Sequence, residues 1–370
     1  MSTSTQHGES AARTPERPDG RGPSDGGGLA RVGSTVLRAV LTQRVLLLVV
    51  LLVVVVGFFL DLSARNYLAA PFDGRYLGLA LINLPPLVML ALAELLVITS
   101  GRGGIDLSVG AIVSLTGMVF GLAHGQWGWP LVPAVLLAAA FGALCGAVNG
   151  GLVAYLGFPP LITTLATYYA FSSLAIVITS QQPISTAPIQ DLYVLARAVP
   201  VVGDVALPLS LLVFLLPTVV VVWLLLARTA WGRRVYAIGT NDVAAEWSGI
   251  DVRRTRFLAF TAAGLISGLV AVVTTAQFAS ARPDAGTAGN GLALPAITIA
   301  VLGGVAITGG IGRVSGVVLA ALLVVWLNAG ILLAVPGNTG AQLQLLALGA
   351  VLVAAALLNG VAVRRYGAVT

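Results

Sequence analysis

The sequence contains no lysine, so arginine supplies all 20 of its basic residues. A P-loop nucleotide-binding motif needs a lysine that reaches the β- and γ-phosphates of ATP. The chain therefore cannot be a conventional P-loop ATPase. If ATP drives its function, a separate ATPase subunit must hydrolyse the nucleotide.

Cysteine and histidine are almost as scarce. Cys145 is the only cysteine, which excludes an intrachain disulfide and a cysteine-based metal site. The two histidines, His7 and His124, lie far apart in the sequence and offer little material for a zinc site. One cysteine and two histidines cannot supply a catalytic nucleophile together with its general base. We therefore expect that the protein has no metal site and is not an enzyme.

Charged residues make up only 9% of the chain, hydrophobic residues make up 58%, and the mean hydropathy is +0.97. These values lie far outside the range of soluble domains and indicate an all-α integral membrane protein. A span needs about 20 apolar residues. By that measure the chain has about ten transmembrane helices, at 45–60, 77–99, 108–123, 131–156, 160–180, 208–227, 257–279, 292–308, 314–334 and 342–363.

The N-terminal segment, residues 1–40, is rich in Ser, Gly, Pro, Arg and Asp and lacks apolar periodicity. This composition predicts a disordered tail on the cytosolic side. The first apolar run starts only at Val45, and no small-residue cleavage site follows it, so we do not expect a signal peptide. Residues 41–366 are expected to form one membrane domain.

The distribution of arginine predicts the topology, because cytosolic loops carry an excess of basic residues. With the N-terminus in the cytosol, 13 of the arginines from Arg31 onward fall on the cytosolic side and four fall outside. The 13 are Arg31, Arg38, Arg44, Arg102, Arg228, Arg233, Arg234, Arg253, Arg254, Arg256, Arg313, Arg364 and Arg365, and the four are Arg65, Arg75, Arg197 and Arg282. Both termini are therefore expected in the cytosol. The net charge of +6 comes from these arginines and does not indicate a nucleic-acid partner.

Two acidic residues lie in or beside the second predicted span. Glu94 falls inside it, where a charge costs about 2.5–3.5 kcal/mol on insertion scales, so it should face the bundle or be protonated. Asp106 lies near the end of a glycine-rich break at 100–107, and with Ser108 it offers capping groups for the next helix. The break is either an ordinary cytosolic turn or an interruption of the helix beside the substrate path. A second glycine-rich segment, 307–316, resembles 98–110, and either a true repeat or chance explains the likeness.

Further polar groups mark the junction of the fourth and fifth predicted spans. Asn149 lies near the end of the fourth, and Pro159 and Pro160 force an extended entry to the fifth. Hydroxyl and aromatic groups then share one helical face, at Thr163, Thr164, Thr167 and Tyr168. These groups could hydrogen-bond to the rim of a sugar and stack on its face, or they could serve helix–helix packing alone. The same two alternatives apply to the in-span amides Asn83, Gln277 and Asn328.

A polar island at 228–256 interrupts the hydrocarbon-rich sequence, and its six arginines flank a short helix candidate. Asn241 can cap this helix and Gly249 can end it. A helix of about two turns is unstable alone in water, so it suits a partner's groove, or else the surface of its own membrane domain. The residues expected to form the contact with a partner are Asn241, Ala244, Ala245, Glu246, Trp247 and Gly249.

Four segments together carry a family resemblance. Residues 232–250 resemble the coupling loop of the ribose-, xylose- and arabinose-type permeases of bacterial ABC importers. Residues 103–110, 159–165, and 300–304 with 309–312 resemble further motifs of this family, in order, within about 45–363. Two departures are Thr240, where a glycine is usual, and the longer turn made by 100–102.

The resemblance implies a subunit of a bacterial inner-membrane importer for a monosaccharide or sugar-like molecule. Its implied partners are a cytosolic ABC ATPase on the 228–256 loop, an extracytoplasmic sugar-binding protein, a second permease copy and membrane lipid. The chain itself would bind no cofactor, because the ATPase uses the ATP and magnesium. The alternative is a self-contained proton-coupled transporter that uses Glu94 or Asp106, since buried acids can carry protons.

Overall fold

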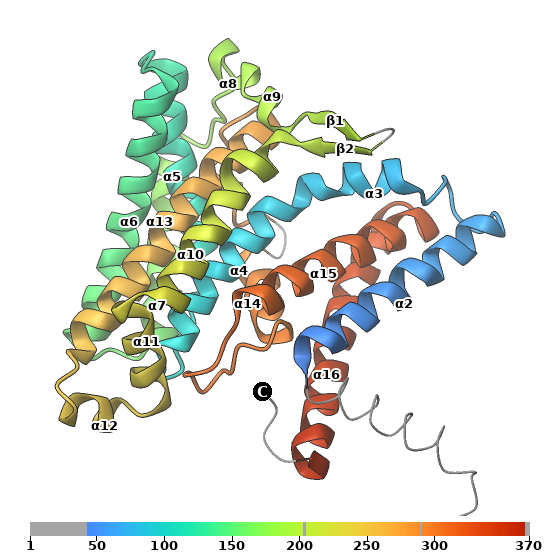
Figure 1. The fold of residues 1–370 in the computed structure, drawn as a ribbon. Coiled ribbons are helices and arrows are strands. Elements are labelled where there is room, and N and C mark those ends of the chain that lie inside the picture. The colour runs from blue at the N-terminus through green and yellow to red at the C-terminus, as the bar shows by residue number, and fades with distance from the viewer. Residues whose placement is uncertain (1–42, 203–204, 289–290, 367–370) are drawn as a thin grey trace, which may run out of the picture.

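The computed structural model describes residues 43–202, 205–288 and 291–366, so the tail predicted at 1–40 lies outside the described residues. Its elements, drawn in Figure 1, are α2 (Arg44–Ala64), α3 (Gly74–Ala80), η2 (Leu81–Asn83), α4 (Leu84–Thr99), α5 (Val109–Phe120), η3 (Gly121–Gln126), α6 (Leu131–Ala154), α7 (Pro160–Val177), α8 (Ala187–Asp191), α9 (Tyr193–Ala196), β1 (Ala198–Val202), β2 (Val205–Pro208), η4 (Leu211–Leu215), α10 (Leu216–Arg228), α11 (Ala230–Thr240), α12 (Asp242–Trp247), α13 (Val252–Phe278), α14 (Ala293–Leu302), α15 (Val314–Ala334) and α16 (Asn338–Tyr366).

The architecture is mainly helical, and each span predicted from the sequence overlaps an observed helix. Eight helical segments in the described part of the chain are long and apolar enough to cross a membrane. The predicted span 292–308 corresponds to the shorter apolar helix α14, Ala293–Leu302, and the predicted span 342–363 lies within α16, of which Asn338–Ala354 is an apolar stretch. A short antiparallel pair of strands, β1 and β2, departs from the predicted all-α class.

Local sequence explains where several helices begin. Pro85 and Pro86 occupy the first turn of α4, and Pro160 opens α7, where a missing backbone N–H costs nothing. At α13 the Asp251 side chain accepts a hydrogen bond from the backbone N–H of Arg254. Such caps satisfy amides that have no partner inside the helix.

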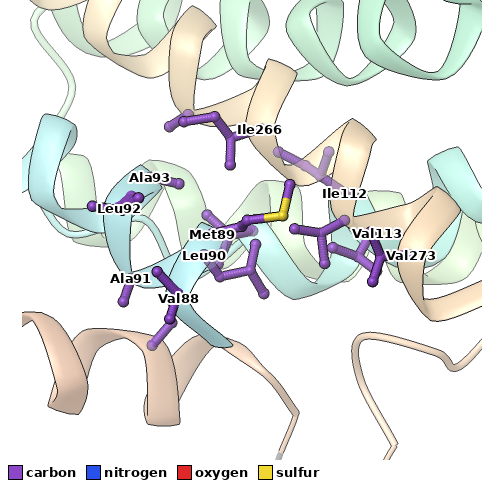
Figure 2. Close-up of a cluster of buried hydrophobic side chains, with 14 of the residues drawn as sticks. Val88, Met89, Leu90, Ala91, Leu92, Ala93, Ile112, Val113, Ile266 and Val273 are labelled. Atoms are coloured by element: carbon purple, nitrogen blue, oxygen red, sulfur yellow. The ribbon is translucent and has the colours of Figure 1, made fainter. Parts of the chain in front are cut away.

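The centre of the bundle is α4. Its side chains from Val88 to Thr99 are fully buried, which matches a helix that is apolar on every side. In Figure 1, α5, α6 and α13 lie to one side of α4, and α2, α15 and α16 lie to the other. Figure 2 shows Met89 of α4 directed toward Ile112 and Val113 of α5.

Helices α6 and α13 pack backbone against backbone through glycine. A Cβ atom on Gly146 of α6 would collide with the carbonyl oxygen of Phe260 and lie 2.9 Å from the Cα atom of Gly264. A Cβ atom on Gly264 would in turn collide with the carbonyl oxygen of Gly142. Small residues allow this close approach, which is a common way for membrane helices to associate.

One end of the bundle gathers the glycine-rich turns and the polar island. The backbone N–H of Gly310 donates to the carbonyl oxygen of Thr99 at 3.0 Å, so the two turns noted in the sequence are neighbours. At the start of α2, Arg44 donates to the carbonyl oxygen of Val301 at 3.4 Å. In Figure 1, α12 lies at this same lower end, where α2 begins and α16 ends.

Candidate functional site

The short helix predicted in the polar island is α12, and it is named the coupling helix here. The Asn241 side chain accepts a hydrogen bond from the backbone N–H of Ala244 at 3.0 Å, so it caps the helix as predicted. Gly249 follows the helix with φ +79°, a conformation that glycine adopts without strain. The coupling helix is thus built from local signals, although it has only six residues.

Most of the coupling helix is open to solvent. Trp247 is 88% exposed, and Val243 is 61% exposed. Ala244 and Glu246 are also exposed, whereas Ala245 is buried against Ile238 and Val252. Ala245 therefore holds the helix on its own domain, and its neighbours present an apolar and acidic face outward.

A second group of predicted residues meets inside the bundle. Asp106 accepts from the Ser108 hydroxyl at 2.6 Å, Asn149 donates to that hydroxyl at 2.7 Å, and Thr164 donates to the carbonyl oxygen of Ile105 at 3.1 Å. Glu94 accepts from the backbone N–H of Asp106 at 3.3 Å. The five side chains Glu94, Asp106, Ser108, Asn149 and Thr164 are fully buried, and they are named the buried polar network here.

The buried polar network carries unsatisfied acceptors. Glu94 Oε1, Asp106 Oδ2 and Asn149 Oδ1 are all buried without a hydrogen-bond partner. Burial raises the pKa of Asp106, and the hydrogen bonds from Ser108 oppose that rise. Among the described residues, no group of three His, Cys, Asp or Glu side chains is placed to hold a metal ion.

The capping groups that the sequence offers for α5, Asp106 and Ser108, are used differently in the structure. The Asp106 carboxylate accepts from both the backbone N–H and the hydroxyl of Ser108, which closes a tight local turn. Ser108 precedes α5 and makes no side-chain cap bond. Within the break at 100–107, Arg102 and Gly103 are exposed, whereas residues 104–107 are buried or half-buried.

A separate cavity of about 510 Å³ gathers the in-span amides that the sequence singled out. Its polar lining consists of Tyr76, Asn83, Thr274, Gln277, Asn328 and Gln344. Gln344 donates to the carbonyl oxygen of Asn328 at 2.9 Å, and Gln277 donates to that of Ile82. The lining residues include no charged side chain. This amide-lined cavity suits an uncharged polar ligand.

A family profile described as the permease component of the branched-chain amino acid transport system matches residues 76–356. The chain belongs to this permease family. The family resemblance noted in the sequence is therefore confirmed, and the permease is a transport subunit and not an enzyme. This membership decides against the self-contained proton-coupled transporter.

Similar proteins include three that are named autoinducer 2 import system permease protein LsrD. They come from Photorhabdus luminescens, Salmonella typhimurium (strain LT2) and Yersinia enterocolitica. Each is 34% identical to the permease, over 75% of this chain and 81% of its own length. No solved structure matches the permease.

The predicted substrate-path residues of the permease fall into three groups. Glu94, Asp106, Asn149 and Thr164 join the buried polar network, and Asn328 lines the amide-lined cavity. Thr163 and Thr167 instead donate to carbonyl oxygens of their own segment, at Pro159 and Thr163. Tyr168 packs edge-on against Tyr169, with ring centres 5.3 Å apart.

Sequence reasoning missed part of the amide-lined cavity. Tyr76 and Gln344 were not predicted there, although each is a polar residue beside or within a predicted span. Ser108 was considered only as a helix cap, yet it joins Asp106 to Asn149. The useful signal is the same in each case, because a polar side chain within a span needs an internal partner.

Proposed function

We propose that the permease is the membrane subunit of an ABC importer for a neutral, sugar-like molecule, and that a separate cytosolic ATPase docks on the 228–256 loop. The observation that carries this proposal is the coupling helix. It is capped, anchored through buried Ala245, and exposes Trp247 at 88%. A large exposed aromatic side chain on a short, anchored helix suits a partner's pocket.

The arrangement of the chain ends supports a cytosolic location for this loop. The coupling helix, the start of α2 and the end of α16 lie at one end of the bundle in Figure 1. The excess of arginine on the loops of that end favours the cytosol. We infer that both termini are cytosolic and that the permease resides in a bacterial inner membrane.

The substrate class follows from the amide-lined cavity. It offers hydrogen-bonding amides and the aromatic side chains of Tyr76 and Phe278, without a charged side chain. A free amino acid carries two charges that such a lining would leave without counter-charges. A neutral hydroxylated molecule fits better, and the relatives named for autoinducer 2 import agree with a substrate outside the amino acids.

The remaining partners follow from the same assignment. The amide-lined cavity lies at the end of the bundle opposite the coupling helix, because it includes Tyr76 near the start of α3 and Phe278 at the end of α13. A substrate-binding protein would deliver its cargo there. A second permease copy would complete the pore, and movement of the ATPases would drive alternating access.

Affinity purification tests the ATPase partnership. The tagged permease, isolated from its native cells in mild detergent, should bring down a P-loop ATPase. A Trp247→Ala, Glu246→Arg double variant should lose it, because both side chains face outward on the coupling helix. The matched control is Trp127→Ala, since Trp127 is also strongly exposed, at 61%, but lies away from the coupling helix. Retention of the ATPase by the double variant would contradict the docking site.

Uptake assays test the substrate class. Cells that express the complete transporter should take up labelled autoinducer 2, and excess D-ribose should compete better than excess leucine. Gln277→Leu should weaken uptake at least several-fold, because it removes an amide from the cavity. Gln182→Leu is the control, since Gln182 is exposed and does not line the cavity. Stronger competition by leucine would refute the neutral-substrate assignment.

A further inference from the structure

Three backbone segments touch directly at the base of the bundle. The end of α11 lies between the two glycine-rich turns, where a Cβ atom on Gly239 would collide with the carbonyl oxygen of Thr99 and the backbone nitrogen of Gly310. A Cβ atom on Gly101 would lie 2.9 Å from the Cα atom of Gly239. These contacts join backbone atoms, so the end of α11 packs directly against both turns.

Charged side chains fasten the coupling helix to the first of these turns. Asp242, the first residue of the coupling helix, lies 2.9 Å from Arg102 Nε and 3.6 Å from Arg256 Nη2. Arg256 also donates to the carbonyl oxygen of Ser100 at 3.2 Å. These three charged residues, Arg102, Asp242 and Arg256, are named the tether here.

The geometry of Arg102 fits this role. Arg102 has φ +59°, in the left-handed region that residues other than glycine rarely adopt. Its side chain is 60% exposed, and that of Asp242 is 25% exposed. An ion pair so open to solvent adds little to stability, so changing Arg102 should leave the fold intact.

The C-terminal part of the same turn belongs to the buried polar network. Four residues beyond Arg102, Asp106 contacts Glu94 through its backbone and Ser108 through its side chain. Ser108 in turn holds Asn149 of α6. A short path of ion pairs, backbone and hydrogen bonds therefore leads from the exposed coupling helix to the interior.

We propose that the tether makes the coupling helix and the 100–106 turn move as one rigid unit, so that a movement imposed at Trp247 reaches the buried polar network. Arg102 and Asp242 are then positioning residues, which act through the turn and do not touch the transported molecule. This inference rests on the proposed function, because it needs an ATPase bound to the coupling helix.

The test follows the turn directly. Ile105 is half-buried within it, so Ile105→Cys in a Cys145→Ala background gives one thiol for labelling with N-ethylmaleimide. The complex with the co-purified ATPase is labelled before and after trapping with ATP and vanadate. We expect trapping to change the labelling rate several-fold. In the Arg102→Gln version, the ATPase should remain bound and hydrolyse ATP while the labelling rate stays constant.

Two further variants separate transmission from general damage. Arg102→Lys keeps the positive charge and should restore the response to vanadate trapping. Asp251→Asn is the matched control, because Asn can keep the α13 cap and Asp251 is not part of the tether. It should respond as wild type does.

The outcomes distinguish this inference from the proposed function. A normal labelling response in Arg102→Gln would overturn the rigid unit, and so would loss of the ATPase from that variant, since Arg102 would then serve docking. A constant labelling rate in the otherwise wild-type complex would also overturn it. Failure of the unaltered permease to bind any ATPase would instead refute the proposed function itself.

Discussion

Replacing Gly146 by alanine tests the close packing of α6 on α13. The added Cβ atom would collide with the carbonyl oxygen of Phe260 and lie 2.9 Å from the Cα atom of Gly264. Both contacts are backbone atoms, so relief requires the helices to separate. Overpacking of this kind costs about 1–3 kcal/mol. Alanine also gains about 0.5–1 kcal/mol of helix stability over glycine, which hides part of that cost.

Gly151→Ala is the control that isolates the collision. Gly151 lies on the same helix, but nothing lies within 4 Å of the position that an added Cβ atom would occupy. The helix-propensity gain is shared by both variants and cancels in their difference. We therefore expect Gly146→Ala to be less stable than Gly151→Ala by about 1–3 kcal/mol.

The assay is reversible unfolding of the purified permease in mixed micelles of dodecyl maltoside and sodium dodecyl sulfate, followed by tryptophan fluorescence. Gly151→Ala should unfold at the same or a higher fraction of sodium dodecyl sulfate than wild type, and Gly146→Ala at a lower one. Equal unfolding of the two variants would refute the argument that contact between these backbones determines the packing of α6 on α13.

Changes at three other positions probe the site. Asn241→Ala removes the cap of the coupling helix, worth about 0.5–2 kcal/mol, and should weaken ATPase binding in the purification assay. Glu94→Gln keeps an acceptor for the Asp106 amide and should unfold like wild type, whereas Glu94→Leu leaves that amide unpaired and should cost about 1–3 kcal/mol. Burial raises the pKa of Asp106, so its contribution to stability is greatest at acidic pH and falls as pH rises through the folded-state pKa. Asp106→Asn should therefore flatten the pH dependence of unfolding, and an unchanged profile would contradict this.

Local signals in the sequence were sufficient for much of the fold. Runs of apolar residues located the helices, and Asn241 and Gly249 located the coupling helix with its cap and its end. These features depend on neighbours within a few residues, which a sequence displays directly. The burial of Ala245 was not predicted, since a helix of six residues is too short for its apolar pattern to reveal the inward face.

The division of the candidate site could not be predicted for a different reason. Glu94 and Asn328 are both polar residues within spans, yet one joins the buried polar network and the other lines the amide-lined cavity. Which amide or acid meets which depends on how α4, α5, α6, α13 and α15 pack. Arg102 was noted only as a cytosolic arginine and as part of the longer turn at 100–102, and its contact with Asp242 arises from a fold that brings residues 102 and 242 together.

The apolar residues around Met89 in Figure 2 separate the amide-lined cavity from the buried polar network. On α4 the cavity ends at Leu87 and the network begins at Glu94, so the intervening layer is about 10 Å thick at 1.5 Å per residue. Moving an ion into an apolar layer of this thickness costs much free energy, because the ion must lose its hydration shell. The apolar layer on α4 therefore opposes the passage of ions between the cavity and the network, a leak that would otherwise discharge the voltage across the membrane.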